Sequence, residues 1–254
     1  MLKISSIIIA KDEEANIGRC IRSQLNCIDE IIVLIDDTTK DNTTKITQSF
    51  PQVKCEIVKW KGFSETKEYA VSKTSNDWVL WIDADEAVTP ELSNELNNFK
   101  RTKPQFSAYS FPRKAYFLGR WIKHSGWYPG RVIRLFDKSK ARFSKNEVHE
   151  YLVVNGQTGN FIYDIEHFTD QTIQHYFYKL NEYTSLAAEE LVKKGKKFSL
   201  VDVFLRPAII FIKMYIIKRG FLDGIEGFIL AVFSSAYVFT KYCKFWERIQ
   251  RYRV

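Results

Sequence analysis

Three short runs of hydrophobic residues lie within the first third of this chain, and each run leads into acidic residues. They are residues 4–10, 30–35 and 78–82. Continuous apolar runs of this length are typical of strands buried on both faces of a parallel sheet. The carboxyl ends of parallel strands meet at one edge of the sheet, which is where open α/β folds bind ligands. We therefore expect the acidic residues to converge at one edge.

Helix-like segments separate these runs. In residues 14–25 the apolar residues recur at spacings of three to four, which is typical of an amphipathic helix. Further helices are expected at residues 42–50 and 65–73, with a short strand at 53–60 between them. Thr89 and Pro90 mark another helix start, because threonine caps a helix and proline fits its first position. The alternation predicts an α/β fold with a mostly parallel sheet flanked by helices.

The character of the sequence changes twice after residue 100. Residues 106–163 are rich in aromatic residues and glycine, which predicts short strands and loops over a site. From residue 172 onward the composition is mostly helical. We expect a catalytic domain over residues 1–170, made of a nucleotide-binding half (1–100) and an acceptor-side half (101–170). A helical, basic extension is expected at residues 171–254.

Composition excludes several classes of protein. Of the 254 residues, 45% are hydrophobic and 27% are charged, which rules out wholesale disorder, collagen and a coiled coil. The four cysteines form no C-x-x-C pair, so a reduced compartment is expected. The apolar run near the N-terminus is too short for a secretory signal. These features predict a cytoplasmic location.

The positive charge is concentrated at the C-terminal end. The net charge is +8, and residues 193–254 contain thirteen lysines and arginines against four acids. The apolar segments 198–218 and 225–240 are interrupted by charges or shorter than the roughly 20 residues that a membrane-spanning helix needs. We expect interfacial helices that bind an anionic membrane surface. The alternative is a helical subdomain packed on the sheet or an oligomer interface, and the sequence makes no prediction of oligomeric state.

Nucleic acid is not an expected partner. The basic residues alternate with long aliphatic runs and not with an aromatic stacking platform.

A divalent cation is expected at the end of the third apolar run. The spacing Asp83-Ala84-Asp85 places two carboxylates on the same side of a strand end. Carboxylates gathered at one edge repel one another unless a cation is bound. Mg²⁺ and Mn²⁺ prefer oxygen ligands, and Mg²⁺ typically takes one or two carboxylates together with phosphate oxygens. The alternative is that both aspartates only solvate a strand end and cap a helix.

Three motifs together resemble the family 2 glycosyltransferases of the GT-A fold. They are residues 6–17 (SIIIAKDEEANI), 30–41 (EIIVLIDDTTKD) and 77–86 (DWVLWIDADE). Residues 126–129 (GWYP), 131–136 (RVIRLF), 147–150 (EVHE) and 220–224 (GFLDG) resemble the subgroup that contains the lipopolysaccharide inner-core β-glucosyltransferases. The Gln-x-x-Arg-Trp signature of processive synthases is absent, which argues against a polymerase. The fold that the resemblance implies is a Rossmann-like GT-A domain with a helical C-terminal extension.

The resemblance also implies roles for the acidic residues. Glu13 and Asp36 would face the uracil and ribose of a UDP-sugar, and Asp41 would support their loop. Asp83 would contact the ribose side of the donor. Asp85 would bind the metal ion on the diphosphate.

The remaining candidates concern the reaction itself. The resemblance implies an inverting transfer in which Glu150 takes the proton of the acceptor hydroxyl, although a surface role for Glu150 stays open. His149 is either a metal or diphosphate contact or a packing residue. Arg131 and Arg134 suit a clamp on the diphosphate or an anionic acceptor, with a salt bridge to a loop acid as the alternative. Lys67 is expected to approach the donor phosphates.

Together these residues and motifs predict a metal-dependent inverting transferase. It would move a hexose, with UDP-glucose as the expected donor, to a saccharide or glycolipid acceptor of the cell envelope, such as the lipopolysaccharide core. It would act at the inner face of a bacterial membrane. Transfer to polyprenyl phosphate, nucleotidyl transfer and a non-catalytic membrane scaffold stay open as alternatives.

Overall fold

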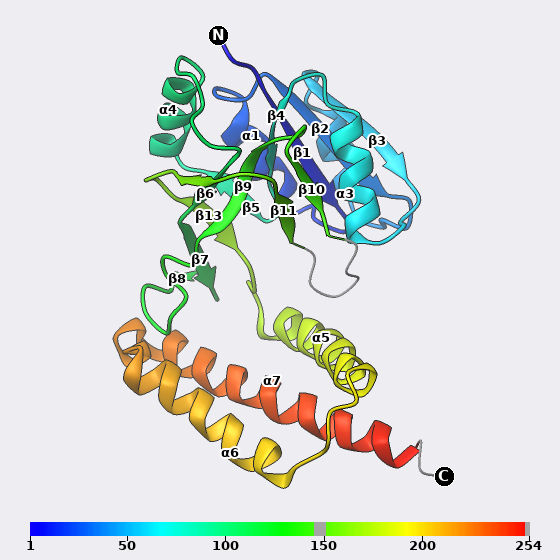
Figure 1. Ribbon diagram of the computed structural model, residues 1–254, viewed down its shortest axis with the longest axis vertical. Coiled ribbons are helices and arrows are strands. Elements are labelled where there is room, and N and C mark those ends of the chain that lie inside the picture. The colour runs from blue at the N-terminus through cyan, green and yellow to red at the C-terminus, as the bar shows by residue number, and fades with distance from the viewer. Residues whose placement is uncertain (145–150, 252–254) are drawn as a thin grey trace. The chain divides into compact units, whose positions relative to one another are not determined.

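The computed structural model describes residues 1–144 and 151–251 (Figure 1). The chain divides into two compact units. The sheet unit comprises Met1–Arg113 and Gly130–His167, and the helical unit comprises Lys114–Pro129 and Phe168–Val254. This division places residues 114–129 with the C-terminal helices, whereas the sequence predicted one boundary near residue 170. The predicted domain boundaries stay predictions.

A seven-stranded sheet forms the centre of the sheet unit, in the order β12-β6-β9-β4-β1-β2-β3. Its strands are β1 (Ile4–Ala10), β2 (Glu30–Asp36), β3 (Val53–Val58), β4 (Trp78–Trp81), β6 (Ala108–Phe111), β9 (Val132–Asp137) and β12 (Thr158–Asn160). Strands β1, β2, β3 and β4 are parallel, and β12 is parallel to β6. Only β9 runs antiparallel to both of its neighbours, β4 and β6. The prediction of a mostly parallel sheet is confirmed.

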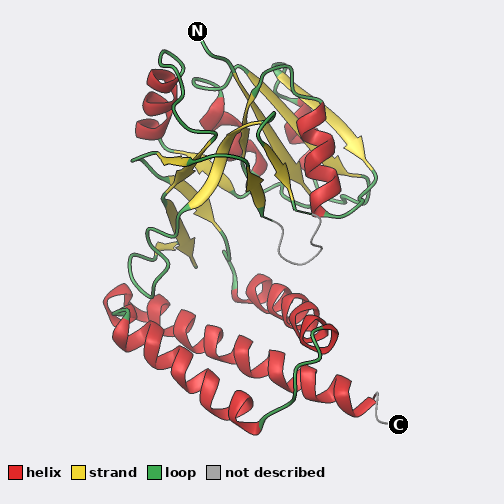
Figure 2. Ribbon diagram, viewed as in Figure 1, coloured by secondary structure: helices red, strands yellow, loops and turns green. Residues whose placement is uncertain are grey.

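Alternate residues of the central strands pack on opposite faces of this sheet. Ile8 and Val33 contribute to one hydrophobic core, and Ile7 and Leu34 to the other. Both faces are covered, which is why these strands are continuously apolar in sequence. Figure 2 shows the helices on either side of the strands.

The helices of the sheet unit divide between the two cores. Residues of α1 (Ile17–Gln24), α2 (Thr43–Gln48) and α4 (Pro90–Phe99) pack in the first core. Residues of α3 (Phe63–Ser72) pack in the second, with the antiparallel strands β10 (Ala141–Phe143) and β11 (Leu152–Val154). The hydroxyl of Thr89 caps α4 by accepting from the backbone N–H of Leu92, as predicted.

A second strand pair follows the acidic turn after β4. Strand β5 (Glu86–Val88) is antiparallel to β13 (Ile165–Phe168), and His167 lies opposite Glu86. This pairing brings residues that are some 80 positions apart in sequence to the carboxyl end of β4. No local sequence pattern indicates this connection to the acidic edge.

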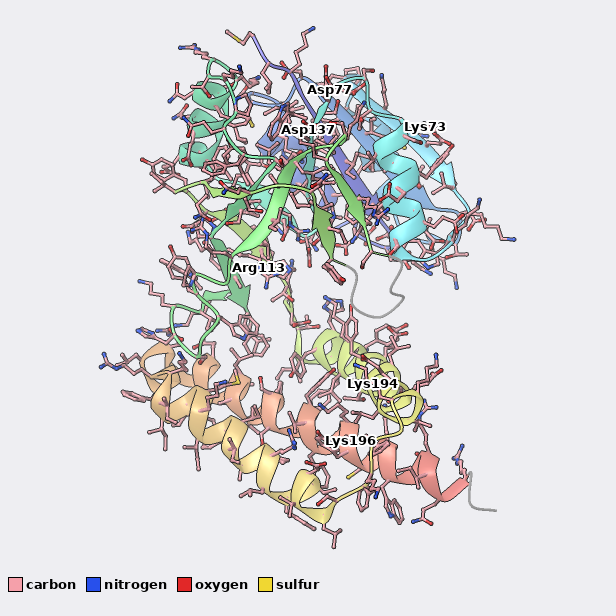
Figure 3. All side chains as sticks on the ribbon, viewed as in Figure 1. Lys73, Asp77, Arg113, Asp137, Lys194 and Lys196 are labelled. Carbon is pink, nitrogen blue, oxygen red and sulfur yellow. The ribbon has the colours of Figure 1, made fainter. Side chains whose placement is uncertain are left out.

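The helical unit contains a short antiparallel strand pair and several helices. The strands are β7 (Arg113–Phe117) and β8 (Arg120–Trp121), and the helices are α5 (Ile173–Lys193), α6 (Leu200–Phe211), the π-helix η1 (Ile212–Ile217), the 3₁₀-helix η2 (Gly220–Asp223) and α7 (Gly224–Arg251). Ala188, Val203, Tyr242 and Phe245 form a small core among α5, α6 and α7. Lys194 and Lys196 follow the end of α5 (Figure 3).

The last helix is longer than the apolar segment 225–240 suggested. Residues Gly220–Arg251 are long and apolar enough to cross a membrane by length and composition, and 22% of the most apolar window is buried. The core helix of a soluble protein can meet the same criterion. The sequence-based argument against a spanning helix had two grounds, the charges that interrupt residues 198–218 and the shortness of residues 225–240. The second ground does not hold, because the helix continues to Arg251.

Candidate active site

The first two acidic loops are bonded to each other at the carboxyl edge of the sheet. The hydroxyl of Thr43 accepts from the backbone N–H of Glu13 at 2.7 Å and donates to Asp41 Oδ1 at 2.5 Å. The second carboxylate oxygen of Asp41 accepts from the backbone N–H of Glu14 at 2.9 Å. Asp41 therefore connects both loops through hydrogen bonds, and its predicted role in nucleotide binding stays a prediction. Glu13 lies beside it, with its carboxylate accepting from Asn16.

Asp36 is buried at the end of β2. Its Oδ1 accepts from the backbone N–H and the hydroxyl of Thr38, and Lys11 Nζ lies 3.7 Å from Oδ2. Burial tends to raise the pKa of this carboxyl, but the hydrogen bonds from Thr38 and the charge of Lys11 outweigh it and lower the pKa. Asp36 is therefore held as a charged acceptor beside the first loop.

Arg134 connects the third acidic turn to the sheet. The side chain lies on β9 and is 3% exposed, and its Nη2 donates to Asp83 and, at 2.6 Å, to Glu86 Oε1. Burial tends to raise the pKa of Asp83, and the charge of Arg134 reverses this and lowers it. For Glu86, which is 1% exposed, burial dominates and the pKa is raised. The predicted alternative for Arg134, a salt bridge to a loop acid, is what the structure shows.

Two cationic side chains lie over the ring of Trp81, the last residue of β4. The Arg134 guanidinium carbon lies 4.1 Å from the centre of its ring and Lys67 Nζ lies 3.8 Å from it. The indole N–H donates to Asp83 Oδ1 at 3.1 Å. Lys67 is 4% exposed, so its stem and ammonium are enclosed next to the acidic turn. The expectation that Lys67 approaches the donor phosphates stays a prediction.

Asp85 pairs with a histidine that the sequence did not single out. His167 Nε2 lies 3.3 Å from Asp85 Oδ2, and both side chains are mostly buried. Burial tends to lower the pKa of His167, but Asp85 outweighs it and raises the pKa. The other ring nitrogen, Nδ1, is buried without a hydrogen-bond partner in the described part of the chain. A carboxylate oxygen and an imidazole nitrogen are both metal-ligand types, so this pair fits a divalent cation.

His167 gave no signal in the sequence because its partner is 82 positions away. It lies on the short strand β13, and only the pairing of β13 with β5 brings it to the acidic turn. Within residues 1–144 and 151–251 there is no group of three or more potential metal ligands. The described residues therefore offer two ligands to an ion at Asp85, and donor diphosphate oxygens and water are suited to the other positions.

The other predicted residues lie elsewhere or outside the described residues. Arg131 donates to the hydroxyl and carbonyl oxygen of Ser110 and to the carbonyl oxygen of Phe161, so it secures the sheet and does not contact the acidic loops. Glu150 and His149 lie in the segment that the structure does not describe. Asp77, labelled in Figure 3, precedes β4 and lies at the opposite end of that strand from Asp83.

One solved structure has a similar fold over nearly the whole chain. The mannosyltransferase PcManGT from Pyrobaculum calidifontis, solved in complex with GDP-Man and Mn²⁺, matches with a TM-score of 0.55. The match covers 96% of this chain and 86% of that one at 10% sequence identity, which supports the fold alone.

Sequence comparison identifies the family. A glycosyltransferase of Rickettsia typhi, RT0209, is 32% identical over 97% of this chain and 88% of its own. The lipopolysaccharide core biosynthesis glycosyltransferase LpsC of Rhizobium meliloti is 28% identical over 97% of this chain and 93% of its own. Residues 5–168 match the model of glycosyl transferase family 2. The predicted resemblance is confirmed: this chain belongs to glycosyl transferase family 2 and has the GT-A fold, with a long C-terminal helix.

Proposed function

We propose that this glycosyltransferase moves a hexose, with glucose as the expected sugar, from a UDP-sugar to a saccharide or glycolipid of the cell envelope, with inversion at the anomeric carbon. One observation carries the proposal. Asp83 and Asp85 follow β4 at the edge where the two nucleotide-side loops are bonded together, and each has a separate partner, Arg134 or His167. The similarity to LpsC supports an acceptor of the lipopolysaccharide core type.

Donor binding would use the acceptor groups at this edge. Glu13 and Asp36 are carboxylates that can accept from the N–H of uracil and the hydroxyls of ribose. Asp41 holds their loops through Thr43. Asp83 would contact the ribose side. Arg134, already bonded to Asp83, would orient that carboxylate, and Lys67 would face the phosphates.

We place the divalent cation at Asp85 and His167. The ion would stabilise the charge that develops on the leaving diphosphate. An imidazole nitrogen in the ligand set favours Mn²⁺ over Mg²⁺, since Mg²⁺ strongly prefers oxygen. The similar mannosyltransferase was solved with Mn²⁺, which agrees with this preference.

The proton of the acceptor hydroxyl would go to Glu150. A single displacement needs one base on the acceptor side, and a carboxylate can fill that role. His149 would contact the ion or the diphosphate, and Arg131 an anionic acceptor. These roles rest on the motif resemblance and not on contacts.

The donor half of the proposal is tested by UDP release from UDP-glucose. With Mn²⁺ the wild-type chain should turn over, and a chelator should abolish release. Asp85→Ala and His167→Ala should each lower kcat by about 100-fold, because the charge on the diphosphate is left without its cation. Asp77→Ala, an exposed aspartate at the opposite end of β4, is the matched control and should keep wild-type activity. Full activity of Asp85→Ala with chelator would refute the metal site.

The base is tested separately. Glu150→Gln should bind UDP as the wild type does in calorimetry, while transfer falls by about 10² to 10⁴-fold. Loss of UDP binding in this variant would assign Glu150 to the donor site instead.

The acceptor test separates the proposal from its rivals. With bacterial envelope extracts, a saccharide acceptor should be labelled by the donor sugar. Labelling of polyprenyl phosphate alone would point to the polyprenyl-phosphate transferase. Release of diphosphate from UTP with a sugar phosphate, in place of UDP release from UDP-glucose, would point to nucleotidyl transfer. Absence of any nucleotide-sugar binding would point to a scaffold.

We also propose that the helical unit binds the anionic cytoplasmic face of a membrane. Between residues 200 and 228, twelve large hydrophobic side chains are at least 40% exposed. In α6 they recur at helical spacing, as with Val201, Phe204, Leu205 and Ile209, whereas Asp202 is buried. An amphipathic helix whose apolar stripe faces outward is suited to lie in a lipid interface. We call these twelve side chains the apolar surface. The excess of basic residues in this part of the chain supports an anionic surface as partner.

A further inference from the structure

A buried carboxylate holds a histidine in the helical unit, and neither residue belongs to the proposed donor site. Asp223, the last residue of η2, is 1% exposed. Its two oxygens accept from the backbone N–H of Lys123 at 3.1 Å and of His124 at 2.9 Å. The side chain of His124 also pairs with it, with Nδ1 2.9 Å from Oδ1. Two backbone N–H groups and the Nδ1 of the His124 ring therefore bond to the same carboxylate, which fixes the position of the imidazole.

Close backbone packing builds this arrangement. The N–H of Ser125 donates to the carbonyl oxygen of Lys218 at 2.9 Å. A Cβ at Gly220 would lie 2.5 Å from Ser125 Oγ, and a Cβ at Gly227 would lie 2.1 Å from the carbonyl oxygen of Gly220. Both positions need glycine for the two segments to approach. The structure thus accounts for the glycines of residues 220–227, which the donor site does not explain.

The hydrogen bond to Asp223 decides what the ring of His124 can offer. A carboxylate oxygen can only accept, so Nδ1 carries the proton of this bond. In the neutral ring the other nitrogen, Nε2, is then an acceptor. The side chain is 33% exposed, and no partner for Nε2 is found in the described residues. The ring is therefore arranged to accept a hydrogen bond from a hydroxyl group of a ligand.

The surroundings of His124 are positively charged. Residues 114–129 and 213–226 together contain six lysines and arginines and two acids. Both acids are already paired: Asp223 with His124, and Glu226 with Arg120 at 3.4 Å. Lys123, Lys218 and Arg219 adjoin the pair directly in sequence or through the Ser125 hydrogen bond. This excess of positive charge suits an anion such as a phosphate.

The apolar surface begins at the same place. Ile216, Ile217, Phe221, Leu222 and Ile225 lie within seven residues of Asp223, and each is 49% exposed or more. A free sugar phosphate has no apolar part that could cover these side chains. A lipid has one, because its chains can cover the apolar side chains while its head group reaches the charged ones.

We propose that His124, held by Asp223, and the adjacent Lys123, Lys218 and Arg219 bind the head group of an anionic phospholipid that carries a hydroxyl next to its phosphate. The lysines and the arginine bind the phosphate, and Nε2 of His124 accepts from the hydroxyl. This inference rests on the proposed membrane association and adds a specific head-group site to it. It makes no use of the donor site.

The test compares two lipids of equal charge. The full chain is mixed with phosphatidylcholine vesicles that contain either phosphatidylglycerol or the same fraction of phosphatidylmethanol, which has no head-group hydroxyl. The wild type should bind the phosphatidylglycerol vesicles about fivefold more tightly, which is the effect of one hydrogen bond. His124→Ala and His124→Gln should bind both kinds of vesicle equally.

A matched histidine in the same unit serves as the control. His175 lies on α5, and its Nδ1 is 3.5 Å from Oδ1 of Asp170, which precedes that helix, so it is also an exposed histidine beside an aspartate. His175→Ala should keep the preference for phosphatidylglycerol. If Asp223→Asn keeps the wild-type circular dichroism, it should lose the preference for phosphatidylglycerol. If it does not keep that spectrum, the His124 variants alone test the inference.

Three results would overturn the inference. They are equal binding of both vesicles by the wild type, a preference that survives in both His124 variants, and full competition by soluble glycerol phosphate, which would make the ligand a soluble ester. The assay contains no nucleotide sugar, so it does not depend on the proposed reaction. Asp85→Ala should keep the lipid preference while losing UDP release, which separates a failure of one proposal from a failure of the other.

Discussion

Arg134 shows how one buried side chain can organise an acidic site. It is enclosed on β9, and its guanidinium bonds to both Asp83 and Glu86 while lying against Trp81. Glu86 is more deeply buried than Asp83, so the arginine is needed to keep a charge there at all. At the residue scale, the acidic turn depends on this cation before any donor binds.

Replacing Arg134 with methionine should destabilise the protein. Removing one partner leaves Glu86 buried without a counter-charge, which typically costs about 3–5 kcal/mol. Urea denaturation of Arg134→Met measures the loss in the free energy of unfolding. The double variant Arg134→Met/Glu86→Gln should regain part of it, because the more deeply buried of the two carboxylates is then neutral. A single variant as stable as the wild type would contradict this account.

Glu30 gives a second residue-scale prediction, on pH. Burial tends to raise the pKa of this carboxyl at the start of β2, but bonds from Lys54, Ser5 and Ser75 outweigh it and lower the pKa to about 2. Lys54 Nζ lies 2.6 Å from the carboxylate. Because the pKa is lower in the folded state than in the unfolded state, the stabilisation is present above about pH 5 and is lost as the pH falls toward 2.

The measurement compares wild type with Glu30→Gln. Their difference in unfolding free energy should shrink by about 2 kcal/mol between pH 7 and pH 3. Glu65→Gln, at an exposed carboxylate whose Oε1 lies 3.6 Å from Nζ of the exposed Lys61, is the control and should show no comparable change. If the difference in unfolding free energy between wild type and Glu30→Gln is constant with pH, the ionised Glu30 carboxylate does not stabilise the fold in this way.

At the scale of elements, α7 packs against the turn before it without any side chain between them. Gly227 faces the carbonyl oxygen of Gly220, and an added Cβ would lie 2.1 Å from that oxygen. Alanine is normally the better helix residue by about 1 kcal/mol. At position 227 the clash with backbone atoms should make alanine less stable than glycine.

Gly227→Ala should therefore lower the melting temperature. Overpacking against a fixed backbone typically costs about 1–3 kcal/mol. Gly18→Ala, inside α1, is the matched control, because its nearest neighbours are the flexible end of Arg22 and Ile46 at 3.3 Å or more. It should be neutral or stabilising. If both variants behave alike in thermal unfolding, the close approach is not required.

At the scale of the whole molecule, the two units carry different surfaces. The sheet unit gathers carboxylates at one edge, whereas the helical unit carries the excess of positive charge and the apolar surface. Such a division suits an enzyme whose donor is soluble and whose acceptor lies at a membrane.

Vesicle sedimentation tests the membrane association. Phe204→Asp and Ile217→Asp, both at strongly exposed positions, should each weaken binding to anionic vesicles by about tenfold, since burial of one large apolar side chain is worth roughly 1.5–3 kcal/mol. Ile57→Asp is the control, because Ile57 is 56% exposed on β3 of the sheet unit. High salt should weaken wild-type binding. Equal binding to neutral and anionic vesicles at low salt would argue against the proposal.

The local pattern of the sequence determined the sheet and the place of its acidic edge. The runs that became β1, β2 and β4 are mostly apolar, although β1 contains the buried Ser5 and Ser6, because both faces of the sheet are covered. Parallel pairing then brings their carboxyl ends together. The residues that follow these strands, Asp36 and Asp83 among them, could be predicted for that reason. Strand periodicity and strand ends are local properties of the sequence, so they can be predicted without knowledge of the fold.

Only the tertiary structure decided the partners of those acids. His167 reaches Asp85 through the pairing of β13 with β5, and Arg134 reaches Glu86 from β9. His124 meets Asp223 across 99 positions of sequence. Contacts of this kind arise from packing between distant segments, for which one sequence contains no periodic signal. The charges of the site were therefore predictable. Of the groups that hold them, Arg134 was predicted as a partner only in an alternative, and His167 was not predicted.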